Sequence, residues 1–286
     1  MAYHVELQIA AKTDTGLVRS HNEDSIAHNH EYGLVILADG MGGYNAGEVA
    51  SAIATSTMKE TVEGQLQTRG WSTRSNLSKY LQQLLVGSVE RANSAILEAA
   101  RAEPQFSGMG TTVVAAVFHQ NKLTVAHVGD SRVYRLRRGE LSLITRDHSL
   151  LQEQIDAGMI DAEAARFSSS RNLITRAVGV DRIVDVEIHD HLTQIDDVYL
   201  ICSDGLSDML SMKEILEIMS STASNLELAC DALVARANKN GGRDNTSVIL
   251  VTVQSSQADT SKFPERAKNW ISEKAKVRWR WKRLTK

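Results

Sequence analysis

Six aspartates of this chain share one sequence context, at the end of a predicted strand and beside small or polar residues. Asp39 follows the apolar run 34–37 and precedes Gly40 in the segment LADGMGG. The others are Asp24 in RSHNED (19–24), Asp130 in HVGDSR (127–132), Asp204 and Asp208 in CSDGLSD (202–208), and Asp244 in GGRDN (241–245). Each one by itself is compatible with a turn or a helix cap, since Asp favours both positions.

As a set, these carboxylates predict a cation site. Strand ends of a compact fold gather on one rim, and carboxylates that converge there raise one another's pKa unless cations neutralise them. Acidic oxygens without His or Cys at ligand spacing match Mg²⁺ or Mn²⁺, which prefer oxygen ligands. Two such ions about 3.5–4 Å apart share a water molecule and lower its pKa, which gives a nucleophile for in-line attack on phosphorus.

The composition is that of an ordinary globular protein with an unusual C-terminus. Of 286 residues, 42% are hydrophobic and 23% are charged. No apolar stretch approaches the roughly 20 residues that span a bilayer, and the first residues predict a strand and no signal peptide. Residues 262–286 contain ten Lys/Arg and two Glu, a net charge of +8, which leaves −11 for the 261 residues before them. An acidic body argues against a nucleic-acid-binding core.

The order of predicted elements favours antiparallel sheets. Hydrophobic periodicity predicts strands at 5–13, around 26, and at 33–38, 111–118, 123–128, 132–137, 141–144, 183–188, 198–202 and 246–253, and helices at 47–67, 77–102, 212–220 and 225–240. Runs of strands with helices segregated between them are typical of antiparallel sheet and not of alternating βαβ units. The irregular segment 149–179 predicts an inserted or mobile element, and the polar segment 255–261 predicts a linker.

Six motifs in this order carry a family resemblance: RSHNEDS, LADGMGG, GMGTTVVAA, VGDSRVYRL, SDGLSD and GGRDNTSV. The chain resembles the metal-dependent Ser/Thr protein phosphatases of type 2C, and their bacterial branch in particular. The resemblance covers about residues 8–254, so a phosphatase domain is expected at 1–254, with 149–179 as a flap-like insertion. It implies an α+β fold, a four-layer α/β/β/α sandwich of two antiparallel sheets flanked by helices, with a binuclear metal centre in a cleft at one end.

The resemblance also implies roles for individual residues. Asp39 matches the aspartate that bridges two metal ions, and the Gly40 carbonyl matches a ligand of one of them. Asp204 and Asp244 match the ligands of the other ion. The remaining matches are Glu23 and Asp24 to residues that hold metal-bound waters, Arg19 to the arginine that binds the substrate phosphate, and Asp130, Asp204 and Asp208 to a third, weaker metal site. Asn245 follows the last ligand and is expected to order its loop.

The implied activity is hydrolysis of phosphoserine and phosphothreonine by direct attack of a metal-bridging water or hydroxide. Two Mn²⁺ or Mg²⁺ ions and the guanidinium of Arg19 would neutralise the phosphate oxygens, so no side-chain nucleophile is needed. The expected partners are phosphorylated proteins and a bacterial Ser/Thr kinase, and the protein is expected to be cytoplasmic and monomeric. The alternatives are a non-catalytic binding module of the same fold and a hydrolase of small phosphate esters or nucleotides.

Several residues near the motifs need a separate interpretation. Met41 stands where many eukaryotic relatives have a His proposed to protonate the leaving group, so a metal-bound water or another acid must do so here. His148, in RDHS, is either a substitute acid or, as we favour, an orienting residue at the start of the next helix. His127 is expected to pack and not to bind metal. Cys202 and Cys230 are expected to be buried thiols.

The predicted flap and the tail carry the least specific signals. Arg171 and Arg176 are candidates for a contact with substrate, although structural or solvated ion pairs are commoner for arginines of this kind. The tail 262–286 lies outside the resemblance, and its cations surround three tryptophans. Such a segment predicts contact with anionic membrane, peripheral to the bilayer, or with an acidic partner; a solvated extension is the alternative.

Overall fold

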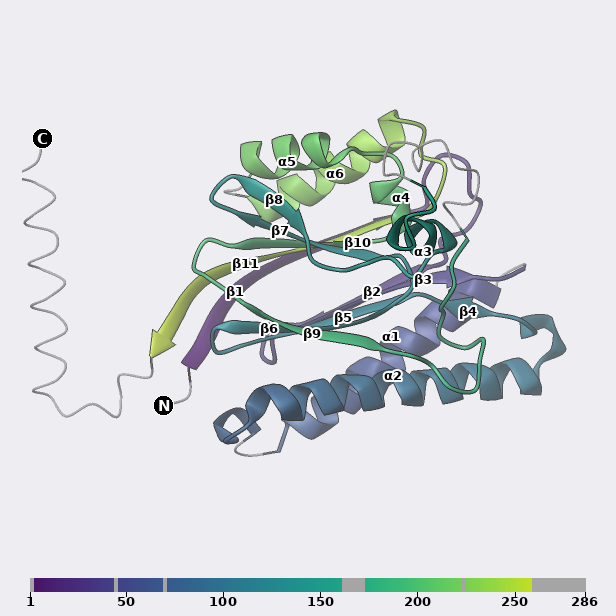
Figure 1. Ribbon diagram of the computed structural model, residues 1–286, viewed down its shortest axis with the longest axis horizontal. Coiled ribbons are helices and arrows are strands. Elements are labelled where there is room, and N and C mark those ends of the chain that lie inside the picture. The colour runs from purple at the N-terminus through teal and green to yellow at the C-terminus, as the bar shows by residue number, and fades with distance from the viewer. Residues whose placement is uncertain (1–2, 44–45, 69–70, 161–172, 223–224, 259–286) are drawn as a thin grey trace, which may run out of the picture.

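The computed structural model describes residues 3–43, 46–68, 71–160, 173–222 and 225–258. Within them the chain forms four layers, with one pair of helices, two β-sheets face to face, and a second group of helices (Figure 1). The predicted α+β sandwich of two antiparallel sheets flanked by helices is therefore confirmed.

The first sheet joins the two ends of the described chain. Its strands run in the order β1 (Tyr3–Asp14), β11 (Thr246–Ala258), β10 (Val198–Cys202), β7 (Arg132–Arg137) and β8 (Glu140–Leu143). Every neighbouring pair is antiparallel. The first and last strands of the domain therefore hold each other by backbone hydrogen bonds.

The second sheet has the predicted Asp39 strand in its interior. Its order is β2 (Asp24–Asn29), β3 (Leu34–Met41), β5 (Val113–His119), β6 (Lys122–Val128) and β9 (Glu187–Leu192), and the short β4 (Gly110–Thr111) pairs with the end of β3. Leu34 and Ile36 pack toward the helices, whereas Val35 and Leu37 pack toward the first sheet. Both faces of β3 are buried, which explains its unbroken apolar run.

Helices cover the outer face of each sheet. α1 (Ala46–Leu66) and α2 (Leu77–Ala102) lie on the second sheet, and the small side chains Ala50 and Ala54 let α1 approach β3 closely. α5 (Met212–Ser221) and α6 (Leu226–Lys239) lie on the first sheet. The other described helices are α3 (Leu150–Asp156), α4 (Asp204–Ser207) and the 3-10 turns Trp71–Thr73 and Pro104–Phe106.

Capping residues fix where the longer helices begin. The Asn76 side chain accepts a hydrogen bond from the Lys79 amide at the start of α2, and the helix ends just before Pro104. Ser211 and Glu214 form a capping box at the start of α5. These signals are local in sequence, so the helix bounds agree with the prediction to within a residue or two.

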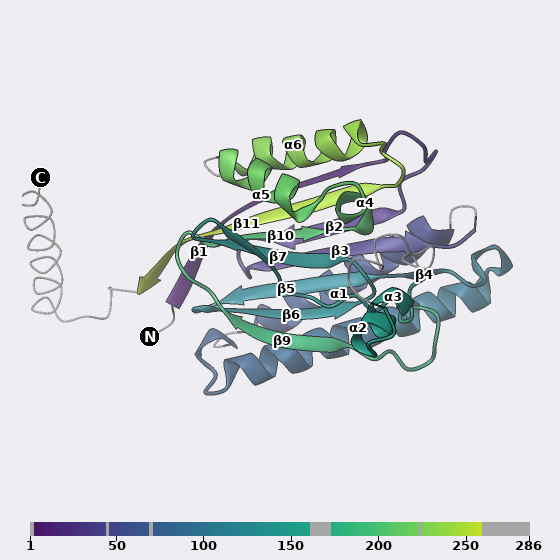
Figure 2. The same ribbon diagram turned by 45° about the horizontal axis from the view of Figure 1, so that its top comes forward.

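Antiparallel pairing brings the predicted acidic loops to one end of the sandwich. Asp14 pairs with Thr246, Cys202 pairs with Val248, and Asp24 pairs with Asp39. The loops that follow β1, β3, β6 and β10, and the loop that precedes β11, therefore leave the sheets on the same side. Figures 1 and 2 show this end at the right, with α3, α4 and β4 around it.

Two predicted boundaries were wrong. The strand expected at 183–188 is β9 at Glu187–Leu192, because its place is set by pairing with β6 and an edge strand can carry polar side chains such as those of HDHL. The linker expected at 255–261 is strand as far as Ala258, because residues 255–258 pair with 3–6 of β1 beyond an irregularity at Glu6/Leu7. Backbone pairing does not require apolar side chains.

Candidate metal centre

Asp39 is presented by the buried strand β3, and Asp24 lies directly across from it on β2. Burial raises the pKa of Asp39 well above its usual value, and the charges of Asp24, Asp204, Asp130 and Asp244 raise it further. Because these charges come from separate segments of both sheets, the carboxylates predicted from the sequence do converge on one place.

The neighbours of Asp39 show the same effect of burial and like charge. Burial, followed by the charges of Asp130 and Asp244, raises the pKa of Asp204 to about 8. Burial raises the pKa of Asp24 to about 6, and burial also raises the pKa of Asp130 to about 6. A raised pKa means that the ionised carboxylate is destabilised, and nearby cations would reverse that balance.

Two carboxylate oxygens at this end are buried without a donor. The Oδ1 atoms of Asp24 and Asp130 have no hydrogen-bond partner among the described residues. The other oxygen of Asp24 accepts a hydrogen bond of 2.9 Å from Ser203 Oγ. Buried oxygens of this kind are costly unless a cation or a cation-held water contacts them, so the donor set fits Mg²⁺ or Mn²⁺.

Two threonines that sequence reasoning did not single out hold the backbone of Asp39. The amide of Thr112 and the hydroxyl of Thr111 each donate to the Asp39 carbonyl at 2.8 Å. The Asp39 amide in turn donates to Thr112 Oγ1 at 3.2 Å. They belong to the motif GMGTTVVAA, so the sequence did contain a signal, but only the fold gives it this role.

Gly40 is glycine because backbone approaches it closely. A Cβ at this position would collide with the carbonyl of Gly47 at the start of α1, and the Gly40 amide donates to the Glu23 carbonyl at 3.1 Å. The Glu23 carboxylate lies against Gly47, where a Cβ would come within 2.7 Å of it. Gly40, Gly47 and Glu23 therefore form one close-packed unit beside Asp39.

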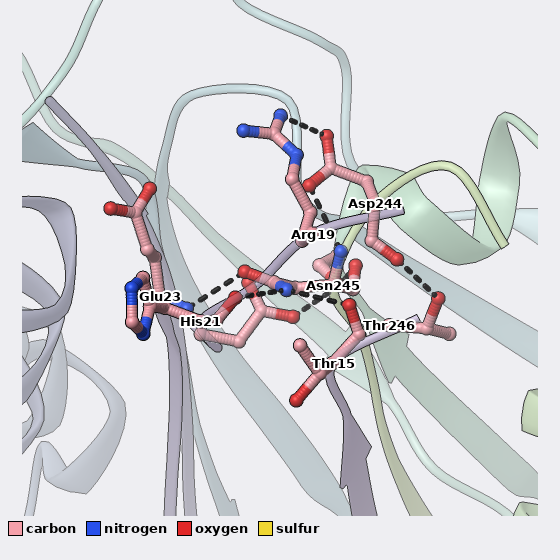
Figure 3. A network of polar contacts seen from close by, with 9 residues as sticks. Thr15, Arg19, His21, Glu23, Asp244, Asn245 and Thr246 are labelled. Atoms are coloured by element: carbon pink, nitrogen blue, oxygen red, sulfur yellow. Dashed lines mark hydrogen bonds and ion pairs between the residues drawn. The ribbon is translucent and has the colours of Figure 1, made fainter. Parts of the chain in front are cut away.

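Asn245 ties the loop between β1 and β2 to the loop before β11 (Figure 3). Its Oδ1 accepts from the Glu23 amide at 2.7 Å, and its Nδ2 donates to the carbonyls of Thr15 and His21, both at 2.9 Å. Its own amide donates to Asp244 Oδ1 at 2.9 Å. The expectation that Asn245 orders its loop is confirmed, and the loop that it holds includes Arg19 and Glu23.

Arg19 reaches across the same site to Asp244. Its Nη2 donates to Asp244 Oδ2 at 2.7 Å, and about half of the Arg19 side chain is exposed (Figure 3). The predicted phosphate-binding arginine and a predicted metal ligand are thus paired with each other. A phosphate anion would offer Arg19 a new partner of opposite charge, and a cation would do the same for Asp244.

Asp204 and Asp208 occupy successive turns at the end of β10. Asp204 opens the short helix α4, and the Asp208 amide donates to its carbonyl at 2.7 Å. A Cβ on the intervening Gly205 would collide with the Asn245 carbonyl, so this turn packs directly on the loop of Asp244. Asp208 is therefore placed near Asp204, as the predicted third metal site requires.

The sequence and the fold both match known phosphatases. Residues 18–239 match the family model described as protein phosphatase 2C. The chain belongs to the protein phosphatase 2C family. The serine/threonine phosphatase Stp of Listeria innocua is 37% identical over 243 residues, which are 84% of this chain and 93% of that protein.

Solved structures agree with this assignment. The Mycobacterium tuberculosis serine/threonine phosphatase PstP/Ppp has a TM-score of 0.78 at 36% identity, covering 87% of this chain and 99% of that chain. The catalytic domain of PstP in complex with two manganese ions has a TM-score of 0.76 at 36% identity, with the same coverage. The sandwich of two antiparallel sheets flanked by helices in this 2C phosphatase therefore matches solved structures of its family.

The structure of this 2C phosphatase describes one of the two predicted flap arginines and both histidines that lie near the motifs. Arg176 pairs with Asp185 at 2.7 Å, both side chains being well exposed, and Arg171 lies outside the described residues. His127 is buried and its Nε2 donates to the Arg146 carbonyl, so it packs as expected. His148 is also buried, and it directly precedes Ser149, which caps α3.

The two cysteines are buried thiols, as the sequence predicts. Cys202 and Cys230 are free and buried in the core between the first sheet and its helices, and burial raises the pKa of each thiol to about 12. Neither is a nucleophile at neutral pH. Over the described ranges, no helix combines the length and the apolar character needed to cross a bilayer.

Asn245→Ala is expected to lower the free energy of unfolding by about 2–3 kcal/mol, because it leaves one amide and two carbonyls without partners. It should also lower kcat, since the loop of Arg19 and Glu23 loses its attachment. Urea unfolding and turnover of p-nitrophenyl phosphate measure the two effects. Asn121→Ala, at an exposed turn, is the control and should change stability by less than about 0.5 kcal/mol. Wild-type stability and turnover in Asn245→Ala would contradict the role given to this side chain.

Proposed function

We propose that this chain, a metal-dependent serine/threonine protein phosphatase of the 2C family, removes phosphate from phosphoserine and phosphothreonine at the carboxylate cluster around Asp39. The observation that carries the proposal is the convergence of buried carboxylates with raised pKa on Asp39. Such a cluster has no structural benefit by itself, because each ionised group destabilises the others. It suits a protein that holds divalent cations there.

The roles proposed for the residues follow their placement. Asp39 would bridge two ions, the Gly40 carbonyl would bind one of them, and Asp204 and Asp244 would bind the other. Glu23 and Asp24 would hold waters of these ions, and Asp130, Asp204 and Asp208 would form a third, weaker site. When bound, Mn²⁺ or Mg²⁺ neutralises the phosphate oxygens and activates water for attack on phosphorus.

Arg19 would orient the substrate phosphate. Its guanidinium is held at the rim by Asp244 and is half exposed, so a phosphate can reach it without rearrangement of the backbone. A phosphate offers the planar fork of Arg19 two oxygens, a geometry that also favours pairing with carboxylates. If Arg19 exchanged its partner Asp244 for the substrate phosphate, the Asp244 carboxylate would become available to a cation.

Asp39→Asn should lower kcat by about a thousand-fold or more, because it removes the central charge that holds both cations. The fold should persist, and the metal-free variant should be at least as stable as the metal-free wild type, because a buried charge is replaced by a neutral side chain of the same shape. Turnover of a phosphothreonine peptide with Mn²⁺, and urea unfolding in EDTA, measure these effects. Asp231→Asn, at an exposed ion pair with Lys12, is the matched control and should retain activity. Full turnover by Asp39→Asn would reject the proposed site.

Two apolar side chains beside Arg19 favour a peptide over a small phosphate ester. Leu17 and Val18 are each 69% exposed, yet their amides both donate to the Gly242 carbonyl, two residues before Asp244. A Cβ on Gly242 would come within 2.8 Å of Leu17 Cγ, so this loop is packed firmly in place. Exposed apolar side chains held next to the phosphate-binding arginine offer a contact to residues that flank a phosphorylated side chain.

The double variant Leu17→Ser, Val18→Ser should lower kcat/KM for a phosphothreonine peptide by about 5- to 30-fold, which corresponds to about 1–2 kcal/mol of lost apolar burial. Its kcat/KM for p-nitrophenyl phosphate and for a nucleotide should not change. Leu143→Ser and Ile195→Ser, at other exposed apolar positions, serve as controls. Equal effects on all substrates would remove the argument for a peptide contact and favour a phosphatase of small esters.

The biological setting is proposed from the sequence and the family. Phosphorylated proteins are the substrates, and a bacterial Ser/Thr kinase is the enzyme that this phosphatase would oppose. We further propose a cytoplasmic monomer whose phosphatase domain, expected at residues 1–254, continues to Ala258 at the end of β11 and includes the 149–179 flap, in which Arg171 and Arg176 contact substrate. The tail 262–286, outside the described residues, would attach the protein to anionic membrane through its net charge of +8 and its tryptophans.

Deleting residues 262–286 should reduce co-sedimentation with phosphatidylserine vesicles by at least about ten-fold at low salt, because each cation near such a surface contributes about 1 kcal/mol and two of the ten cations are enough for that factor. Binding of the full chain should fall as salt is raised, and neutral phosphatidylcholine vesicles serve as the control. Unchanged vesicle binding after the deletion would exclude the tail as the anchor.

A further inference from the structure

His148 forms hydrogen bonds with both backbone groups of Gly129, the residue before Asp130. The amide of Gly129 donates to His148 Nδ1 at 3.1 Å, and the amide of His148 donates to the Gly129 carbonyl at 3.0 Å. Gly129 directly precedes Asp130, and His148 is almost fully buried. The ring of His148 binds the amide of Gly129 and the backbone amide of His148 binds its carbonyl, so the two bonds together fix the orientation of the peptide that leads into Asp130.

These contacts define the protonation of His148. A backbone amide can only donate, so Nδ1 must be an unprotonated acceptor, and the proton of the neutral ring lies on Nε2. Nε2 is 3.1 Å from Glu187 Oε2, which accepts that proton in a hydrogen bond. Glu187 Oε1 also accepts from His189 Nε2 at 2.6 Å. Glu187 on the edge strand β9 therefore selects the form of His148 that can accept from Gly129.

The same side chains do not form a further metal site in this arrangement. His127, His148 and Glu187 do place possible ligand atoms within 4.8 Å of one another. However, the two imidazole rings are stacked at 4.7 Å with an interplanar angle of 16°, and ring lone pairs lie in the ring plane. They cannot converge on one ion, and both nitrogens of His148 already have partners.

The residues around His148 form hydrogen bonds with the neighbouring strand and loop. We call residues 144–148 the clamp segment. It makes four further contacts with residues 127–133. The Ile144 amide donates to the Val133 carbonyl, the Val133 amide donates to Thr145 Oγ1, His127 Nε2 donates to the Arg146 carbonyl, and Nε and Nη2 of Arg132 donate to the Asp147 carboxylate. The contacts extend along both sides of Asp130.

The clamp segment is also connected to Asp39, through Gly129 and Thr112. Gly129 has a φ of +104°, and a Cβ there would come within 2.6 Å of Thr112, so its backbone packs directly on that side chain. Thr112 bonds both the amide and the carbonyl of Asp39, and its Oγ1 lies 2.8 Å from Ser131 Oγ. Gly129 and Ser131, on either side of Asp130, thus contact the residue that holds the central carboxylate.

We propose that His148 is a positioning residue of this phosphatase: by holding Gly129 at its amide and its carbonyl, it fixes the backbone of Asp130 and, through Thr112, that of Asp39. Glu187 supports it by keeping the proton on Nε2. The inference rests on the proposed site residues, but the hydrogen bonds that it names exist whether or not a cation is bound.

Two conservative variants separate the two bonds of the His148 ring. In His148→Asn the amide oxygen lies where Nδ1 was and can still accept from Gly129, but the bond to Glu187 is lost. In His148→Gln the amide nitrogen reaches toward Glu187, and the Gly129 amide is left without an acceptor. His148→Ala removes both bonds, and His30→Asn, at an exposed turn, is the control for loss of a histidine.

We expect His148→Gln and His148→Ala to weaken Mn²⁺ binding at the weakest site about ten-fold and to lower kcat by a similar factor. The KM for p-nitrophenyl phosphate should stay within about two-fold, since Arg19 is not touched. His148→Asn should resemble the wild type in all three quantities. Mn²⁺ titration by isothermal calorimetry and steady-state kinetics measure them, with thermal unfolding to show that each variant is folded.

A spectroscopic measurement tests the inference independently of activity. In metal-free protein, long-range ¹H–¹⁵N correlations should show His148 unprotonated at Nδ1, and the Gly129 amide resonance should shift in His148→Gln but stay near its wild-type position in His148→Asn. A proton on Nδ1 would overturn the proposal, as would wild-type Mn²⁺ binding by folded His148→Gln, or equal defects in His148→Asn and His148→Gln. Asp130→Asn tests the third metal site itself: if it binds Mn²⁺ as the wild type does, that site is rejected, and the Gly129 resonance and kcat still decide the role of His148.

Discussion

The repulsion between buried carboxylates is the constraint on which this structure depends. Burial raises the pKa values of Asp24, Asp39, Asp130 and Asp204, and the charges of neighbouring carboxylates raise each of them further. Ionising these buried groups costs free energy, so they destabilise the fold in the absence of cations. The sandwich supplies the necessary stability elsewhere, in three apolar cores between its four layers, and so can hold the acidic cluster at one end.

The cluster is assembled from both sheets. Asp24 and Asp39 belong to the second sheet, whereas Asp204 and Asp244 stand at the ends of strands of the first. Their relative position is therefore set by how the two sheets pack, through the core that includes Val35, Leu37, Tyr199 and Ile249. A rigid, well-filled core between the sheets keeps carboxylates from distant segments at a fixed spacing.

The hydrogen bonds around the site act mostly on backbone and leave carboxylate oxygens available. Asn245 bonds backbone groups of three residues of the loop after β1, Thr112 bonds both backbone groups of Asp39, and His148 bonds both backbone groups of Gly129. Oδ1 of Asp24 and Oδ1 of Asp130 meanwhile have no partner in the described chain. Neutral side chains and backbone amides thus provide the preorganisation, and the acidic oxygens are left to bind cations.

The sequence by itself determined most strands and helices, the acidic residues and their preference for divalent cations, because apolar runs, helix caps and strand-end aspartates are local signals. The four layers were expected only from the family resemblance. It failed for β9 and for residues 255–258, whose strands exist through pairing with β6 and β1 and not through their own apolar pattern. It also gave Thr112 no role and left that of His148 open, since Thr112 acts on Asp39 and His148 on Gly129 and Glu187. Only the tertiary structure brings such distant groups within hydrogen-bonding distance, so only it decides how the carboxylates are held.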